Sequence, residues 1–292
     1  LSVGSQSTGM GHETSMPQIL GDRLGVGLDK ISYIQGDTDA TPLGGGHGGS
    51  RNLEVGGNAV LTAANDVIGK ANQIAAHLLN SNEDDISFAG GVFADVKTEQ
   101  TISMEDVIAA SFEKGRLPKD METGCLDTDA TFEREIISCP NGCHAAEVEV
   151  DPETGSINVE RYWVVDDFGT IINPLLAEGQ VMGGVAQGLG QALMEEIVYD
   201  SESGQLVTGS LMDYALPRAD SMPVMEMAFF EDAPTAKNPL GVKGAGEAGC
   251  CGAPPAIVNA VLDALKGDGV LHIEMPLTPE KVWRAISEAK SR

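Results

Sequence analysis

Basic side chains are scarce in this 292-residue sequence, which has 18 lysines and arginines against 44 aspartates and glutamates. The formal net charge is -26 at pH 7 and the sequence pI is about 4.3. Nucleic acids and anionic membrane surfaces are bound through a basic face. The charge therefore argues against both kinds of partner, and we interpret the acidity as that of a cytoplasmic protein.

Long apolar runs are lacking as well, since no segment approaches the ~20 apolar residues that span a bilayer. No secretory signal is visible, and the chain opens on Leu1 without a start methionine. We therefore expect a fragment or a processed piece of a longer protein. The length still suffices for one large domain or two modest domains with their own cores.

Cysteines are few, and aromatic residues make up only 4% of the chain, whereas glycine occurs 36 times. The five cysteines form no Cys-x-x-Cys pair, which excludes a zinc ribbon or an iron–sulfur framework. We expect small, buried, reduced thiols, with Cys250 or Cys251 lining a site as the alternative. The glycine content favours a loop-rich protein with both helices and strands.

The glycine-rich stretch Gly241–Gly249 carries one carboxylate, Glu247, and a helix-like segment over 253–265 follows it. Glycines let the backbone adopt a positive φ and let a ligand come close. This arrangement suits one base aimed at one reacting atom, and a solvent-facing turn is the alternative.

Two further glycine turns occur near the N-terminus. Gly9-Met10-Gly11 precedes a helix expected from an N-cap at Ser15 to about Leu24, and such a turn offers backbone N–H groups to an anion. Gly48-Gly49-Ser50-Arg51 ends the most glycine-dense loop, which starts at Gly44. Its N–H groups, hydroxyl and guanidinium favour a phosphate-bearing ligand, although a Walker ending is missing and a solvent loop is the alternative.

Two strands are expected over 131–138 and 145–150, joined by a hairpin at Asn141-Gly142. Cys139, Cys143 and His144 lie close to this turn and suggest a metal. Three ligands within six residues do not converge easily on a tetrahedral ion, so we expect no metal ligands in the chain.

Long helices are expected over 55–79 and 178–196 from their apolar spacing. The second is rich in glycine, which suits close helix packing or the approach of a ligand. Gln187 lies in this segment, and its amide is a candidate for contact with a polar cofactor.

Gly241–Glu247, followed by 252–260, resembles the C-terminal signature of the molybdenum hydroxylases, the large subunits of xanthine dehydrogenase, aldehyde oxidase and carbon monoxide dehydrogenase. Gly36-Asp37-Thr38-Asp39 with Gly49-Ser50-Arg51, and Asp167-Phe168-Gly169 through Asn173-Pro174, are similar to further motifs of this family. The resemblance covers the whole chain but only the later part of a family large subunit.

The resemblance implies a role for each glycine segment. Glu247 would be the active-site base beside the molybdenum, with Gly246 next to the cofactor. Residues 9–11, 48–51 and Gln187 would contact the molybdopterin. The family has glutamine where this chain has Met10, and an aromatic residue is common where it has Gly48. Because a thioether cannot donate the amide hydrogen bond, Met10 puts the contact at this position in doubt.

The fold implied is α+β, with mixed sheets and packed helices in two lobes of the molybdopterin-binding domain, 1–140 and 141–292. The reaction implied is oxidative hydroxylation of a small carbonyl compound, a heterocycle or CO, with oxygen from water. The cofactor is molybdenum-molybdopterin, and its cytosine dinucleotide form is left open. FAD and iron–sulfur clusters are expected on partner subunits, and the N-terminal part of the large subunit as a further partner, so the isolated chain should be inactive. The alternative is a non-catalytic module that binds a cofactor or phosphate ligand within a larger complex.

Overall fold

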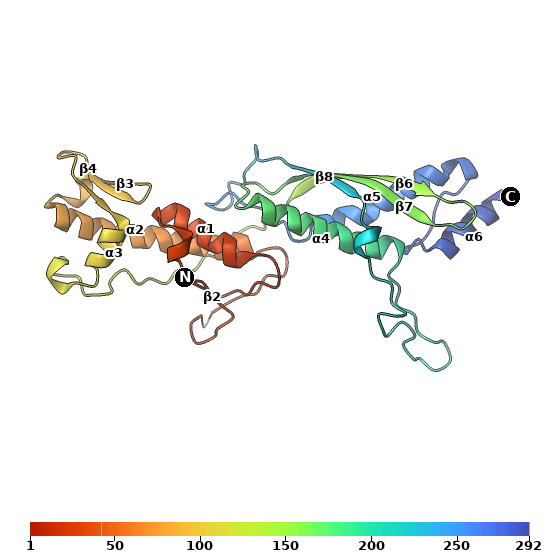
Figure 1. Ribbon diagram of the computed structural model, residues 1–292, viewed down its shortest axis with the longest axis horizontal. Coiled ribbons are helices and arrows are strands. Elements are labelled where there is room, and N and C mark those ends of the chain that lie inside the picture. Colours follow the sequence, from red (N-terminus) through yellow and green to blue (C-terminus); the bar gives the residue numbers. More distant parts are fainter. Residues whose placement is uncertain (42, 292) are drawn as a thin grey trace. The chain divides into compact units, whose positions relative to one another are not determined.

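The computed structural model describes residues 1–41 and 43–291; Pro42, which ends the polar turn after Gly36, and Arg292 lie outside the described residues. Internal contacts divide the chain into two compact units, coloured from red to yellow and from green to blue in Figure 1. The first unit contains Leu1–Ser138 and Thr235–Val242, and the second contains Cys139–Pro234 and Lys243–Arg292. The lobes expected from the sequence, 1–140 and 141–292, assigned residues 235–242 to the second lobe, whereas the contacts group these residues with the first unit.

The first unit combines three helices with two small sheets. Its strands are β1 (Ser2–Val3), β2 (Ile34–Gln35), β3 (Ile86–Ala89), β4 (Val92–Asp95) and β5 (Thr101–Ser103), and its helices are α1 (His12–Leu24), α2 (Asn58–Leu79) and α3 (Met104–Ala110). β1 pairs with β2 in parallel, and β3-β4-β5 form an antiparallel sheet. The core lies between α2, α3 and this second sheet, with Ile74, Phe93 and Val107 fully buried.

The long helix expected over 55–79 is present, but its first turn is a π-helix over Leu53–Gly57. A π-turn widens the helix locally and is frequent at functional sites. It directly follows the glycine-dense loop, so that loop leads into a buried helical segment rather than into solvent. The helix ends at Asn80, whose left-handed conformation closes it.

The second unit is a three-stranded sheet with helices packed on it. Its strands are β6 (Asn141–Val150), β7 (Ile157–Asp167) and β8 (Val224–Phe229), and its helices are α4 (Pro174–Leu193), α5 (Ala248–Leu265) and α6 (Pro279–Lys290). β6 and β7 are antiparallel. β7 and β8 are parallel, because α4 and a long loop bring the chain back to the end of the sheet at which β7 began. Together with the first unit, these mixed sheets and packed helices confirm the expected fold class.

A bulge in β7 decides which side chains enter this core. Arg161 pairs with Glu147 and Val159 with Val148, so Glu160 is the extra residue. The alternation shifts by one residue there, and Val159 and Tyr162 both face the core although three positions separate them. The buried face of the sheet therefore continues through the bulge.

Helices α4 and α5 cross with their backbones in contact. A Cβ at Gly184 would lie 2.9 Å from the Gly249 Cα, and a Cβ at Gly249 would lie 2.6 Å from the Val181 carbonyl oxygen. Gly188 meets Ala253 and Pro254 of α5 in the same way. Close helix packing, expected for the glycines of this segment, is confirmed at Gly184 and Gly188.

Three local expectations were wrong. Residues 131–138 form no strand, and Asn141 and Gly142 lie inside β6, paired with Asp167 and Asp166, instead of forming a hairpin turn. The glycine is needed for close approach, because a Cβ at Gly142 would lie 1.9 Å from the Asp166 Oδ1. Helix α1 starts at His12 rather than after Ser15.

Helix α5 also begins one turn earlier than expected, so Pro254 and Pro255 lie in its interior. There they cannot donate to the carbonyls four residues earlier, and these lose their helical partners. Contrary to the sequence reading, Ala248–Asp268 has the length and hydropathy of a membrane span. In this unit one side of it packs into the core, with Ile257, Val261 and Leu265 buried, and 33% of the span is buried.

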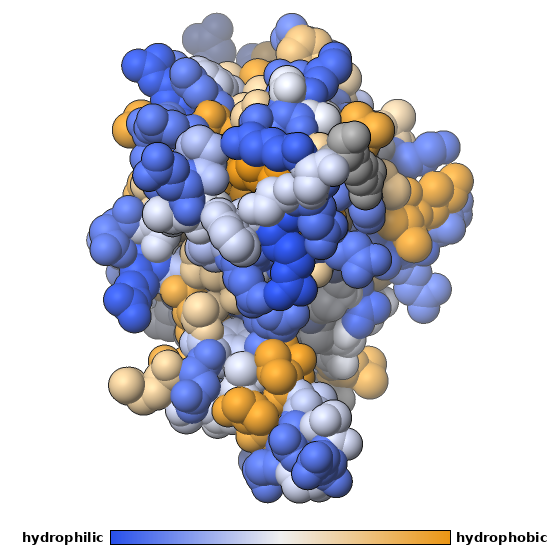
Figure 2. Space-filling view, turned by 90° about the vertical axis from the view of Figure 1, so that its right-hand side faces the viewer, coloured by the Kyte–Doolittle hydropathy of each residue, from blue (hydrophilic) through white to orange (hydrophobic). Residues whose placement is uncertain are grey.

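Hydrophilic residues dominate the face in Figure 2, with smaller apolar areas between them.

Five free cysteines are described. Cys139, Cys143 and Cys251 are exposed, which corrects the expectation of buried thiols. Cys250 is half-buried, and burial, followed by the neighbouring Cys251, raises the pKa of its thiol. It therefore stays protonated near neutral pH and is a weak nucleophile.

Candidate functional site

The first glycine turn forms the N-terminus of α1. Gly9 has φ 100° and Gly11 has φ 73°, values that side chains rarely adopt. Gly11 is the N-cap, without a side-chain cap, and its carbonyl accepts hydrogen bonds from Thr14 and Ser15. Met10 is half-buried and donates its backbone N–H to the Ser7 hydroxyl at 3.2 Å. The turn thus presents the positive end of a 13-residue helix.

A buried polar chain joins this turn to the glycine-dense loop. The Asn52 amide lies 2.8 Å from the His12 Nδ1, and the Ser5 hydroxyl donates to the Asn52 Oδ1. Burial lowers the pKa of His12, partly opposed by Glu13 and reinforced by His47. The imidazole is therefore neutral at pH 7, and its Nδ1 accepts from Asn52 while its Nε2 carries the proton. Two of the predicted segments, 9–11 and 48–51, are brought together in this way.

The glycine-dense loop is open where a ligand could approach. Gly46 and Gly49 have φ 66° and 80°, and Ser50 also has a positive φ, 51°. A Cβ at Gly46, Gly48 or Gly49 would meet no atom within 4 Å. The Arg51 guanidinium donates to the Gly45 carbonyl of the same loop. The loop predicted to form an anion nest is therefore open at these glycines, and its guanidinium is turned onto its own backbone.

The donors of this loop fit a phosphate-bearing ligand. The His47 Nδ1 is buried and has no hydrogen-bond partner among the described residues. Ser50 and Arg51 follow it, and residues 44–52 contain no carboxylate. A loop with an unsatisfied ring nitrogen, a cation and open glycines suits an anion such as the phosphate of a pterin cofactor.

The second unit carries the glutamate loop. Lys243 donates its backbone N–H to the Phe168 carbonyl at 2.7 Å, and its ammonium lies 2.6 Å from the Asp167 carboxylate. Both side chains are almost buried. Burial acts to raise the pKa of Asp167, but the Lys243 ammonium and the Gly169 N–H outweigh it and hold that pKa below its usual value. This ion pair, which we call the Lys243 clamp, fixes the start of the loop on the end of β7.

Glu247 ends this loop as the N-cap of α5, with an exposed side chain. Its carbonyl accepts from the Cys251 N–H at 3.0 Å, so its backbone is part of the first helical turn. Gly246, directly before it, is exposed as well. The predicted base is thus anchored on both sides and open to an incoming molecule.

Gln187 lies on the exposed face of α4, beside Gly183, where a Cβ would meet no atom within 4 Å. It follows Gly184 by three residues, and Glu247 precedes Gly249 by two. Gly184 and Gly249 are in contact where α4 and α5 cross, so the exposed residues Gln187 and Glu247 both lie within three residues of this crossing. Gln187, Gly246 and Glu247 therefore belong to the second unit, whereas the two other glycine segments belong to the first.

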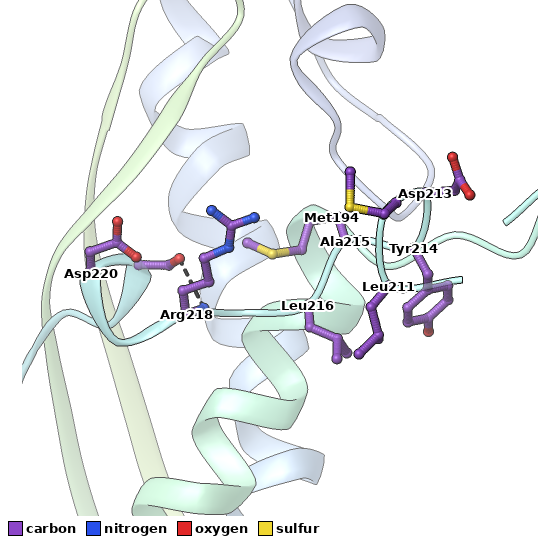
Figure 3. Close-up of a pocket in the computed structure, with 10 residues that line it drawn as sticks. Met194, Leu211, Asp213, Tyr214, Ala215, Leu216, Arg218 and Asp220 are labelled. Carbon is purple, nitrogen blue, oxygen red and sulfur yellow. Dashed lines mark hydrogen bonds between the residues drawn. The ribbon is translucent and has the colours of Figure 1, made fainter. Parts of the chain in front are cut away.

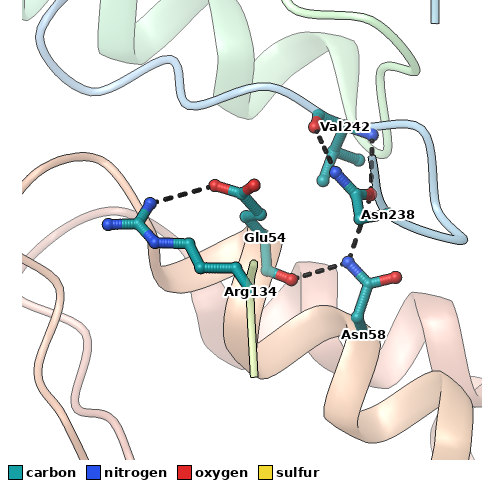
Figure 4. Close-up of polar contacts among 5 residues, drawn as sticks. All are labelled: Glu54, Asn58, Arg134, Asn238 and Val242. Carbon is teal, nitrogen blue, oxygen red and sulfur yellow. Dashed lines mark hydrogen bonds and ion pairs between the residues drawn. The ribbon is translucent and has the colours of Figure 1, made fainter. Parts of the chain in front are cut away.

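In the first unit, a buried amide network holds the residues that lead to the glutamate loop (Figure 4). Asn238 donates to the Val242 carbonyl at 2.9 Å and accepts from the Val242 N–H at 3.2 Å. Asn58 of α2 donates to Asn238 and accepts from the Leu240 N–H. Glu54 pairs with Arg134 at 3.2 Å through one oxygen, and its other oxygen is buried without a partner among the described residues.

The suggested metal ligand His144 has other partners. Its Nδ1 lies 2.9 Å from the Tyr162 hydroxyl, and its Nε2 lies 3.2 Å from the Asp166 carboxylate. Burial and the Asp166 carboxylate raise the pKa of Tyr162 well above its usual value. In the part of the chain that the structure describes, no three His, Cys, Asp or Glu residues gather as they would around a metal.

A hollow of about 500 Å³ opens at the C-terminal end of α4 (Figure 3). Met194, Leu216 and Arg218 are among its lining residues, and none of the predicted site residues lines it. No pattern in the sequence indicated this hollow.

Sequence reasoning also missed residues that hold the site segments. His12 and Asn52 lie next to the predicted segments but were not selected, and the position of His12 directly after Gly11 was the available signal. Asp167 was named only as part of a family motif and not as a site residue, yet it binds Lys243. The spacing between these two residues in the sequence could not reveal this ion pair.

Comparison with known proteins identifies the family. A family model described as the molybdopterin cofactor-binding domain matches residues 1–223. The chain therefore belongs to the family of molybdopterin cofactor-binding domains, as found in the large subunits of molybdenum hydroxylases. The family model ends before Glu247.

Individual relatives extend the similarity over nearly the whole chain. The nicotine 6-hydroxylase large subunit of Paenarthrobacter nicotinovorans is 40% identical over 98% of this chain and 35% of its own length. The carbon monoxide dehydrogenase large chain of Hydrogenophaga pseudoflava is 34% identical over 98% of this chain and 35% of its own. This chain thus spans about a third of the curated relatives that it matches.

Two solved structures share the fold. The Cu,Mo-CO dehydrogenase in its carbon monoxide reduced state has a TM-score of 0.92 and 33% identity, over 99% of this chain and 36% of that one. The quinoline 2-oxidoreductase of Pseudomonas putida 86 has a TM-score of 0.90 and 37% identity, over 98% and 36%.

Proposed function

We propose that this chain binds molybdenum-molybdopterin and that Glu247 is the base of an oxidative hydroxylation. The observation that supports the proposal best is the placement of Glu247, exposed at the N-terminus of α5 and anchored through the Lys243 clamp. When bound, the molybdenum cofactor supplies the redox centre for the reaction. The open loop with His47, Ser50 and Arg51 is proposed to bind its phosphate, with residues 9–11 and Gln187 as further contacts.

The reaction we propose converts a C–H bond of the substrate into a C–OH group, or CO into CO2. In both cases the added oxygen atom comes from water. Two electrons and two protons leave, and Glu247 accepts a proton. The electrons pass to iron–sulfur clusters and FAD on partner subunits. The remaining part of the large subunit is the other proposed partner, so we expect no turnover from the isolated chain.

A nitrogen heterocycle is the substrate class that we would assay first. Two of the relatives described above carry the names of a nicotine hydroxylase and a quinoline oxidoreductase, at 40% and 37% identity. Carbon monoxide and aldehydes are the next classes to assay, since relatives with those names are also similar.

The test uses protein purified from its source with its accompanying polypeptides. Molybdenum and released pterin are measured per chain, the pterin is analysed for a cytosine nucleotide, and turnover is followed with an electron-accepting dye. Glu247→Gln should keep the molybdenum and lower turnover by about 100-fold or more, the range of general-base catalysis. Glu288→Gln, on the exposed face of α6, is the matched control and should change neither. Turnover of Glu247→Gln within tenfold of the wild type would show that another group is the base.

The second candidate is a non-catalytic cofactor-binding module, and Met10 is the observation that favours it. Its thioether cannot donate the hydrogen bond that an amide would give. If this weakens binding, Met10→Gln should raise the molybdenum content per chain. A full molybdenum content in the wild type, together with turnover, would exclude this candidate.

A further inference from the structure

Between α4 and β8 the chain leaves the body of the second unit in a long excursion, the teal loop below α4 in Figure 1. We call residues 195–218 the arm. Its root is firmly attached: the Tyr214 hydroxyl donates to the Glu195 carboxylate at 2.7 Å, and Glu195 lies over Gly190, where a Cβ would meet its Oε1 at 2.0 Å. The arm therefore starts from a fixed position on the end of α4.

Beyond its root the arm exposes three successive apolar side chains. Ile197 and Tyr199 are 64% and 62% exposed, and Val198, between them, is 40% exposed. Two backbone bonds, from Val207 to the Val198 carbonyl and from Asp200 to the Gln205 carbonyl, join its two limbs. A two-stranded ribbon is marginally stable alone, and grouped exposed apolar side chains of this kind mark an interaction surface.

The hollow at the root of the arm is lined by apolar residues together with the charged residues Asp213, Arg218 and Asp220. Its walls include Met194, Leu211, Met212 and Leu216, and Figure 3 shows Met194, Leu211 and Leu216 beside it. Met212 is 92% exposed and Leu211 is 76% exposed. Exposed methionine and aromatic residues are typical of the contact centre of an interface, where one partner's side chain fills a pocket of the other. In Figure 2, apolar residues also appear on the lower projection, above its hydrophilic tip, at the level at which the arm lies in Figure 1.

Two observations favour one occupant. The relatives contain about two thirds of a large subunit that this chain does not match, although the match covers 98% of this chain. A second copy of the chain is disfavoured, because each copy carries a net charge of -26 and the arm itself has five acidic residues and one arginine. A chain segment with an apolar centre and a basic rim would match this surface.

We propose that the arm and its hollow are the surface on which the remaining part of the large subunit docks. This inference rests on the proposed function, because that function supplies the partner. The arm inserts between elements of that partner, which covers both of its faces, and the hollow receives one apolar side chain.

The test compares the isolated chain with the protein as purified from its source. Met212→Cys is labelled with a maleimide, and each labelled peptide is quantified by mass spectrometry so that the five natural cysteines are resolved. We expect labelling in the isolated chain and at least tenfold slower labelling in the source protein. Glu288→Cys, on exposed α6, is the matched control and should be labelled equally in both.

A benzophenone attached to Met212→Cys then identifies what covers the arm. Cross-links to polypeptide of the large subunit outside these 292 residues support the inference. Cross-links to a second copy of this chain, or to an iron–sulfur or flavin subunit, overturn it, as does equal labelling in both states. The molybdenum content of the same sample reports on the proposed function separately, so that molybdenum with an uncovered arm would refute only the docking surface.

Discussion

Two neighbouring glycines of α4 allow a test of the helix crossing in which one serves as the control for the other. Gly183 is exposed and a Cβ there meets no atom within 4 Å, whereas a Cβ at Gly184 lies 2.9 Å from the Gly249 Cα and 3.0 Å from the Cys250 nitrogen. The obstructing atoms belong to a helix backbone, which cannot turn aside as a side chain can. Alanine should therefore be tolerated at position 183 and should destabilise the helix crossing at position 184.

The magnitude follows from two opposing contributions. Alanine in a helix interior is more stable than glycine by roughly 0.5–1 kcal/mol, and this gain is common to both positions. Overpacking a core contact costs typically ~1–3 kcal/mol and acts only at Gly184. In the difference between Gly183→Ala and Gly184→Ala the common gain cancels. Gly184→Ala should therefore be the less stable variant by about 1–3 kcal/mol.

Urea unfolding followed by tryptophan fluorescence measures this difference. Both tryptophans, Trp163 and Trp283, lie in the second unit, so the signal reports on the unit that contains the crossing. With a slope of roughly 2 kcal/mol per molar urea, the two midpoints should differ by about 0.5–1.5 M. A Gly184→Ala midpoint equal to or above that of Gly183→Ala would refute the close contact of α4 and α5.

Three further predictions concern buried polar groups. Asn58→Ala should lower the stability of the first unit by about 1–3 kcal/mol, because buried partners lose their hydrogen bonds. Asn65→Ala on α2 should change the stability less, because it loses only an exposed hydrogen bond from Arg23. Circular dichroism during urea unfolding distinguishes the two variants, and equal effects would contradict the network. His144→Phe should destabilise the second unit by about 1–3 kcal/mol, because it leaves the buried Asp166 carboxylate and Tyr162 hydroxyl without this hydrogen-bond partner. A loss below about 0.5 kcal/mol in the fluorescence assay would count against these contacts. The pKa of Asp167 is lowered in the folded state, so its contribution to the free energy of unfolding is complete above its unfolded pKa of about 3.8 and is lost as the pH falls through the lower folded value. Asp167→Asn should therefore reduce the acid sensitivity of unfolding below pH 4. An unchanged dependence of stability on pH would argue against the ion pair with Lys243.

The elements that local patterns specify were predictable from the sequence. The apolar spacing over 55–79 predicted α2, because helix periodicity acts over a few residues. The family motifs likewise indicated a molybdopterin-binding domain, since each is a contiguous run of residues. The roles of the individual site residues stay predictions.

What the sequence could not provide depends on residues distant along the chain. Gly142 reads locally as a hairpin turn after Asn141, and only the neighbouring strand with Asp166 makes it a strand residue. The clamp between Asp167 and Lys243 joins positions 76 residues apart. A bulge such as that at Glu160 also leaves no mark in composition, because it is set by the pairing of two strands.

The path of the chain between the two units limits how the protein can be divided. The chain passes from the first unit to the second after Ser138, returns at Thr235 and leaves again after Val242. A fragment ending at residue 138 would lack 235–242 and leave the Asn58 amide without Asn238 and Leu240. Two fragments made by a single cleavage after Ser138 should therefore restore the hydrogen bonds of Asn58 only when they associate with each other. Separating the two units completely would require cutting the chain at three places.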